Sequence, residues 1–215
     1  LGALTECLAA RADRVIAVEI DRRVCALLRA RLAQAKNVTV RCEDILDFSW
    51  DGLADATVVG AIPYQLTSPI LGLLAEARQV IRKAILILQE EVAQRLLATP
   101  RTKAYGRLSV LAAYCWEASA LFPVPRGAFF PQPNVDSRCL QLVRRLRPPV
   151  TVVNESRFFA VVKSAFSHLR TPVGVVRQVR NRLGEHRRVF GFDEHAGHAT
   201  FDNFRKHADR RCDNR

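Results

Sequence analysis

Short apolar runs alternate with amphipathic stretches along the first hundred residues of this chain, and this alternation constrains its fold most strongly. Residues 15–18 form a continuous apolar run of the kind found in strands that are buried on both faces. Residues 22–35 follow with apolar side chains at helical spacing on one face and arginines on the other. Because strands that alternate with helices usually form a parallel sheet covered by those helices, the pattern predicts a doubly wound α/β fold.

The remaining elements follow the same pattern up to Pro100 and a different one beyond it. Further strands are predicted over 38–42, 57–60 and 84–88, and further helices over 4–12, 70–77 and 90–98. Beyond Pro100, a helix is predicted over 108–116, an antiparallel strand pair over 118–124 and 137–145, and a helix over 157–166. The dipeptide Pro148-Pro149 is typical of a linker, so we divide the chain into a domain over 1–147 and a C-terminal region over 148–215.

The chain is strongly basic, with a formal net charge of +12. This excess predicts an anionic partner, because the release of counterions from phosphates drives sequence-independent binding of nucleic acid. A codon bias toward arginine is an alternative explanation that needs no partner. The sequence also contains no methionine, which indicates that the chain begins inside a longer protein.

The six cysteines are scattered and show neither CxxC nor Cys/His spacing. The sequence therefore predicts reduced, mostly buried thiols and no metal site. His195 and His198 near the C-terminus are three residues apart, but the pattern places no third ligand beside them. No apolar run is long enough to cross a bilayer and no signal peptide is evident, which predicts a cytoplasmic protein.

The segment 58–71, VVGAIPYQLTSPIL, reads as a strand, a tight turn and a helix. In an open α/β sheet, ligands bind at such carboxyl ends of strands. Pro63 fixes the turn and biases Ile62 toward extended geometry, so that the Ile62 carbonyl points outward with Tyr64 beside it. A fixed acceptor next to an aromatic ring suits a flat ring that bears an amine, such as a nucleobase. The alternative is a turn that only packs on its own sheet.

Acidic residues stand at the ends of two successive predicted strands. Glu19 ends the first strand, and a carboxylate there can accept hydrogen bonds from both hydroxyls of a ribose. Glu43 and Asp44 end the next strand, where a carboxylate can accept from the exocyclic amine of adenine. Each position is also compatible with an ordinary solvated strand end. Together they indicate a ligand that contains adenosine.

Several short motifs of this chain follow one another in an order that is specific to a known family. They are LGALT at 1–5, VIAVEID at 15–21, the Glu43-Asp44 pair, IPY with TSP at 62–69, QEEVAQRL at 89–96, KAYGRLSVL at 103–111 and FFPQPNVDS at 129–137. Over residues 1–147 the chain resembles the S-adenosylmethionine-dependent rRNA adenine dimethyltransferases of the KsgA type, with the Erm-type methylases as relatives.

The resemblance implies a Rossmann-like doubly wound methyltransferase sheet, whose N-terminal strand would precede Leu1, and a small helical C-terminal domain. It also implies S-adenosylmethionine as cofactor. Gly2 would be the last glycine of the cofactor loop, Glu19 with Ile20 would hold the ribose, and Asp44 with Glu43 and Ile45 would lie at the adenine.

For the target adenine, the resemblance implies a site made by the turn at Ala61, Ile62, Pro63 and Tyr64 together with Phe129. Tyr64 and Phe129 would stack on the two faces of the base, the usual way of holding an unpaired base. The family has Asn or Asp where this chain has Ala61, so a side-chain acceptor for the amine is missing. Losing one positioned hydrogen bond in an active site costs about 2.7–4 kcal/mol by analogy with an oxyanion-hole donor.

The implied function is transfer of methyl groups to the exocyclic amine of adenine in small-subunit rRNA, linked to ribosome biogenesis. The implied partner is small-subunit rRNA or the pre-ribosomal small subunit, bound by a monomer. A row of arginines near the C-terminus predicts a phosphate-binding stripe, which includes Arg177, Arg180, Arg182, Arg187 and Arg188. One alternative is a catalytically impaired RNA-binding homologue of the same fold. Another is an unrelated α/β nucleotide-binding enzyme that acts on a small molecule.

Overall fold

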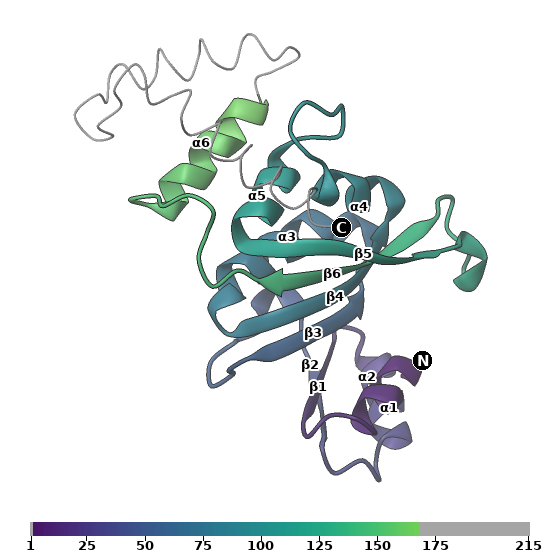
Figure 1. The fold of residues 1–215 in the computed structure, drawn as a ribbon. Coiled ribbons are helices and arrows are strands. Elements are labelled where there is room, and N and C mark those ends of the chain that lie inside the picture. The colour runs from purple at the N-terminus through teal and green to yellow at the C-terminus, as the bar shows by residue number, and fades with distance from the viewer. Residues whose placement is uncertain (1, 168–215) are drawn as a thin grey trace, which may run out of the picture. The chain divides into compact units, whose positions relative to one another are not determined.

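The computed structural model of the chain describes residues 2–167 (Figure 1). The chain divides into two compact units, and each unit combines separate stretches of sequence. The first unit consists of Leu1–Ala56 and Ile62–Ile81, and the second of Thr57–Ala61 and Arg82–Arg215. We describe each unit by itself.

The first unit is built around a parallel pair of strands. Its elements are α1 (Ala3–Ala9), β1 (Val15–Glu19), α2 (Arg22–Arg31), β2 (Val38–Cys42), η1 (Ile45–Asp47), η2 (Tyr64–Leu66), α3 (Thr67–Glu76) and η3 (Ala77–Gln79). β1 and β2 pair in register from Val15 opposite Val38 to Glu19 opposite Cys42. The two strands therefore end side by side, at the same edge of the pair.

Helix α2 begins directly after β1 because Asp21 caps it. The Asp21 Oδ1 atom accepts a hydrogen bond of 2.8 Å from the main-chain amide of Arg23, which satisfies one of the free amides of the first turn. Cys25 and Leu28 lie on the buried face of α2. This short loop and cap place the start of α2 next to the ends of β1 and β2.

The second unit contains a four-stranded sheet with the order β3-β4-β6-β5 (Figure 1). Its strands are β3 (Ala56–Ala61), β4 (Ile81–Gln89), β5 (Trp116–Val124) and β6 (Ser137–Arg144), and β6 runs antiparallel to both of its neighbours. The core of the sheet consists of fully buried side chains that alternate along the central strands, among them Ala84, Leu86 and Leu88 of β4 and Leu140 and Leu142 of β6.

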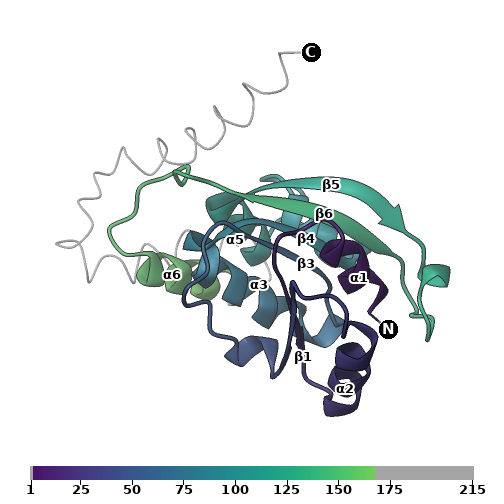
Figure 2. The same cartoon turned by 90° about the horizontal axis from the view of Figure 1, so that it is seen from below.

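Three helices complete the second unit: α4 (Glu90–Leu97), α5 (Arg107–Cys115) and α6 (Glu155–Ser167). α5 and α6 lie side by side in both views (Figures 1 and 2). The Tyr114 hydroxyl donates a hydrogen bond of 2.9 Å to Glu155, and the Tyr114 ring contacts Phe158 and Phe159 at centroid distances of 5.1 and 5.3 Å. The start of α6 is thus anchored on α5. The predicted boundary at 147/148 stays a prediction, since residues 168–215 lie outside the described part.

The predicted strands and helices are confirmed, with differences at their ends. The helix predicted over 4–12 ends at Ala9, because the Asn37 side chain donates hydrogen bonds of 2.8 Å to the carbonyls of Ala9 and Ala12. The helix predicted over 22–35 ends at Arg31, because the chain must turn there to start β2. The α/β class is confirmed, and the described strands are divided between a two-stranded and a four-stranded sheet.

The prediction of reduced thiols is wrong for Cys25 and Cys42, which are joined by a disulfide. The reason is tertiary: the first turn of α2 and the end of β2 bring the two Cα atoms to 5.9 Å although the residues are 17 apart in sequence. Among the described residues, Cys7 and Cys139 are free cysteines. Residues 2–167 contain no cluster of three or more metal-ligating side chains. Every helix within that range is too short or too polar to span a bilayer.

Candidate functional site

The acidic residues predicted to share one edge of the sheet do so in the first unit. Glu19 is the last residue of β1 and lies opposite Cys42, the last residue of β2. The main-chain amide of Glu43 donates a hydrogen bond of 3.1 Å to the Glu19 carbonyl. The two strand ends are therefore fixed to each other, and Glu19, Glu43 and Asp44 stand at neighbouring positions.

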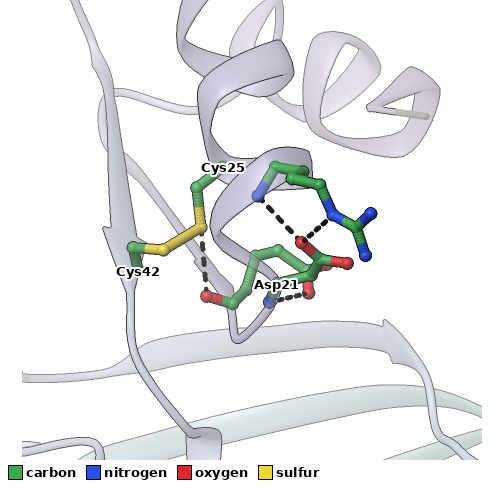
Figure 3. Close-up of polar contacts among 5 residues, drawn as sticks. Asp21, Cys25 and Cys42 are labelled. Carbon is green, nitrogen blue, oxygen red and sulfur yellow. Dashed lines mark hydrogen bonds and ion pairs between the residues drawn. A yellow bond between two sulfur atoms is a disulfide. The ribbon is translucent and has the colours of Figure 1, made fainter.

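The Glu19 carboxylate is half-buried and partly engaged. Its Oε1 atom accepts a hydrogen bond of 3.0 Å from the main-chain amide of Asp21, within the loop shown in Figure 3. Its Oε2 atom accepts no hydrogen bond from the described residues. One oxygen thus holds the side chain in place while the other is available to a ligand that donates hydrogen bonds. The neighbouring Ile20 side chain is largely exposed.

Asp44 is held by the turn that it starts. Its Oδ1 atom accepts a hydrogen bond of 2.9 Å from the main-chain amide of Leu46 and so caps η1, whose first residue is Ile45. Glu43 differs from Asp44, because its Oε1 atom is buried and does not cap a turn. This atom lies 2.9 Å from Arg41 Nε, with which it forms an ion pair. This oxygen is therefore already engaged within the chain by a guanidinium.

Gly2 precedes α1 with a φ of 82°, in the left-handed region that glycine adopts without strain. A Cβ atom at this position would lie 2.7 Å from Leu28 Cδ2. The left-handed backbone therefore favours glycine here, and the Leu28 side chain would have to shift to admit a larger residue. Its predicted place in the cofactor loop stays a prediction.

The Ala61–Tyr64 turn directly follows β3, which ends at the exposed Ala61. Tyr64 starts η2 and is half-buried. The Pro63 carbonyl accepts a hydrogen bond of 2.9 Å from the main-chain amide of Leu66, whereas no hydrogen bond to the Ile62 carbonyl is found among the described residues. The sequence predicts the Ile62 carbonyl as the acceptor for a ligand amine. The Pro63 carbonyl is already engaged within the turn, so the Ile62 carbonyl is the better candidate for binding the amine.

Phe129 lies in the second unit, in the loop that joins β5 and β6 and contains η4 (Arg126–Ala128). The base of this loop is anchored by Asp136, whose Oδ1 atom accepts from the Arg126 amide at 2.9 Å and whose carbonyl accepts from the Glu90 amide at 3.0 Å. The ring of Phe129 is half-buried and that of Phe130 is fully exposed. Tyr64 and Phe129 belong to different units, and their predicted sandwich stays a prediction.

Sequence inspection missed an ion pair that ties β6 to α4. The Arg138 Nε atom donates to both carboxylate oxygens of Glu90, at 3.1 and 2.8 Å. These hydrogen bonds lower the pKa of Glu90 below its usual range, against the opposing effect of burial. No local pattern could reveal the pair, because its residues are 48 positions apart.

This ion pair gives a pH-dependent prediction. Because the folded-state pKa of Glu90 is lowered, its stabilising contribution is present at neutral pH and is lost as the pH falls below the usual glutamate range. We expect Glu90→Gln to reduce the free energy of unfolding by about 1 kcal/mol at pH 7, a modest value because both side chains are partly exposed. Urea unfolding at pH 7 and pH 4 measures this. A difference between variant and wild type that does not shrink toward pH 4 would contradict the prediction.

The five arginines of the predicted phosphate-binding stripe, Arg177, Arg180, Arg182, Arg187 and Arg188, lie outside the described residues. So do His195 and His198. The stripe therefore stays a prediction.

Comparisons with known proteins agree with the geometry. Residues 1–192 match the family model described as ribosomal RNA adenine dimethylase. The chain is 41% identical over 181 residues to ribosomal RNA small subunit methyltransferase A of a Geobacillus species, an alignment that covers 80% of this chain and 62% of the relative. The corresponding protein of Bacillus mycoides is 43% identical over 178 residues, which cover 79% of this chain and 61% of the relative. The chain thus spans about three fifths of the length of these relatives.

Solved structures give the same result. The crystal structure of the 23S rRNA methyltransferase ErmE has a TM-score of 0.64 and 34% identity, and the match covers 79% of this chain and 68% of that one. A dimethyladenosine transferase from Plasmodium falciparum has a TM-score of 0.74 and 26% identity, with coverage of 86% and 67%. Because the family model matches most of the length of this chain, the chain belongs to the ribosomal RNA adenine dimethylase family.

Proposed function

We propose that this chain is the catalytic part of an enzyme that transfers methyl groups from S-adenosylmethionine to the exocyclic amine of adenine in small-subunit rRNA, linked to ribosome biogenesis. The observation that carries the proposal is the fixed arrangement of Glu19 and Asp44 at adjacent strand ends, in a chain that also has the Ile62–Tyr64 turn directly after β3. The names of the relatives support rRNA as the substrate.

The carboxylate acceptor at the end of β1 fits the cofactor. Glu19 Oε2 accepts no hydrogen bond from the described residues, and the ribose of S-adenosylmethionine presents hydroxyls that can donate to it. Glu19 would hold the ribose, with Ile20 beside it, while Asp44 with Glu43 and Ile45 would lie at the adenine and Gly2 in the cofactor loop. The cofactor supplies an electrophilic methyl group on sulfur.

The chain's own residues would position the target base. Tyr64 and Phe129 would stack on its two faces, and the Ile62 carbonyl would accept one hydrogen of its amine. Ala61 and Pro63 would shape the turn. Holding the nitrogen lone pair in line with the methyl group supplies the orientation that such a transfer requires. The amine nitrogen would gain the methyl group as sulfur leaves as a neutral thioether, and the proton of the amine would pass to water, so that no residue of the chain has to act as a general base.

A second candidate function is RNA binding in ribosome assembly without efficient catalysis. Ala61 favours it, because its methyl side chain offers no acceptor for the amine, and the Pro63 carbonyl is engaged within the turn. The net charge of +12 is compatible with both functions.

The remaining parts of the proposal concern partners and location. We propose the pre-ribosomal small subunit as substrate, a monomer as the active form and the cytoplasm as location. The domain over 1–147 would carry the chemistry. The region over 148–215 would bind phosphates through Arg177, Arg180, Arg182, Arg187 and Arg188.

Binding and transfer measured together separate the two candidates. Small subunits that lack the modification are titrated with the full gene product that contains residues 1–215, across a salt series, and then supplied with labelled S-adenosylmethionine. If the chain is a methyltransferase, we expect salt-dependent binding and the appearance of label in the RNA. Salt-dependent binding without label would support the assembly function, and binding that does not respond to salt would contradict both.

A further inference from the structure

Cys25 and Cys42 form a covalent connection within the candidate cofactor site. Cys25 lies in the first turn of α2 and Cys42 is the last residue of β2, and their sulfur atoms are bonded (Figure 3). Their Cα atoms are 5.9 Å apart, within the range usual for disulfides. The connection therefore joins the start of a helix to the end of the neighbouring strand.

Both cysteines contact the backbone that carries the acidic residues of the site. Cys42 lies opposite Glu19 in the strand pair and directly precedes Glu43 and Asp44. The Cys25 sulfur lies 3.3 Å from the Glu19 carbonyl oxygen, the same oxygen that accepts from the Glu43 amide at 3.1 Å. A change in the state of the two sulfur atoms therefore acts directly on the hydrogen bond that fixes the strand ends to each other.

Cys42 is the more accessible of the two cysteines. Cys25 is 1% exposed, whereas Cys42 is half-buried. Thiol–disulfide exchange requires that a thiolate reach a disulfide sulfur, so Cys42 is the residue that an external reagent meets first. Cys25, protected behind it, then resolves the mixed disulfide.

We propose that Cys25 and Cys42 are a redox-modification site that controls how firmly the strand ends bearing Glu19 and Asp44 are held. The oxidant is a low-molecular-weight disulfide such as glutathione disulfide. The Cys42 thiolate attacks it, forms a mixed disulfide and releases one thiol. The Cys25 thiol then loses its proton, attacks the Cys42 sulfur and releases the second thiol. In total, two protein thiols are oxidised and one small disulfide is reduced to two thiols.

The two states differ in what holds the strand ends. In the dithiol state, the Cys25 S–H can donate to the Glu19 carbonyl but nothing covalent links α2 to β2. In the disulfide state, the bond closes a loop with a sequence separation of 17 and restricts the opening of the strand ends. We expect oxidation to raise the melting temperature by roughly 5–10 °C and to slow hydrogen exchange of the Glu43 amide about 10–100-fold. Any effect on cofactor affinity rests in addition on the proposed function.

The test uses the purified full chain equilibrated with glutathione disulfide or with dithiothreitol. Differential alkylation and peptide mass spectrometry identify the bonded cysteines, and hydrogen exchange and thermal melting compare the two states without any cofactor. Cys42→Ser should behave like the reduced protein under both conditions, and Cys7→Ser, which alters an exposed free cysteine of the same unit, should behave like wild type. Reduced wild type provides the same comparison if Cys42→Ser does not fold.

A cross-linked peptide containing Cys25 and Cys42, together with slower exchange at Glu43, supports the proposal. No such peptide after oxidation, or equal exchange and melting in both states, overturns it. Because these readouts need neither cofactor nor RNA, they are independent of the proposed function. A chain that shows the redox difference but binds no S-adenosylhomocysteine in either state would contradict the proposed function and leave the redox site standing.

Discussion

Replacing Ala61 by Asn is expected to raise the rate of methyl transfer by about 10²–10³ at saturating cofactor. Asn adds a side-chain carbonyl that can accept from the target amine at the end of β3. Of the Ile62 and Pro63 carbonyls, that of Ile62 accepts no hydrogen bond from the described residues, whereas that of Pro63 accepts from the Leu66 amide. Ala61 is exposed, so the longer side chain meets no buried neighbour. Single-turnover kinetics with labelled cofactor measure the change.

Ala61→Val is the matched control for this variant, because it adds volume without an acceptor and is expected to give no gain. An equal rise in both variants would show that bulk rather than the amide is responsible. No rise with Asn, in a protein whose RNA affinity is unchanged, would mean that backbone acceptors already suffice. The absence of a side-chain amide at position 61 would then not limit the rate of methyl transfer.

Replacing Glu19 by Gln is expected to weaken binding of S-adenosylhomocysteine by roughly 10–100-fold, which corresponds to about 1.5–3 kcal/mol for hydrogen bonds to a charged group. The wild-type carboxylate has one oxygen occupied by the Asp21 amide and the other available. The Gln side chain has a single oxygen, and this oxygen must replace Oε1 toward Asp21. Its NH₂ group then faces the ribose hydroxyls, where an acceptor is needed. Isothermal titration calorimetry measures the affinity.

Glu76→Gln is the control, because Glu76 is an exposed residue at the end of α3 in the same unit. It removes the same charge and is expected to leave the affinity unchanged. Equal weakening in the two variants would point to a general charge effect. An unchanged affinity in Glu19→Gln would remove Glu19 from the cofactor site.

The sequence predicted the strand ends of the first unit well because their signals are local. Apolar runs bounded by acidic residues placed β1 within one residue of its end and β2 without error. The paired ends of these strands then follow from parallel geometry, which explains why Glu19 and Asp44 were predicted as neighbours. Helix ends were less predictable. The end of α1 depends on Asn37, a residue 28 positions beyond Ala9.

Features that depend on distant residues could not be read from local patterns. The disulfide joins Cys25 and Cys42 across 17 positions with no recognisable spacing, and the Glu90–Arg138 pair joins elements across 48 positions. The use of the Pro63 carbonyl by the Leu66 amide depends on the geometry of η2, which the Pro-Tyr pattern does not specify. These contacts adjust how the site residues are held, whereas the identity of the residues was apparent from the motifs.

Nucleoside analysis tests the central claim most directly. Small subunits that lack the modification are incubated with the full gene product and S-adenosylmethionine, and their RNA is digested and separated by liquid chromatography with mass spectrometry. The account predicts methylated adenosine, carrying one or two methyl groups on the exocyclic amine, and its loss in Glu19→Gln at limiting cofactor. Unmodified adenosine at saturating cofactor, or methyl groups on another base, would contradict it.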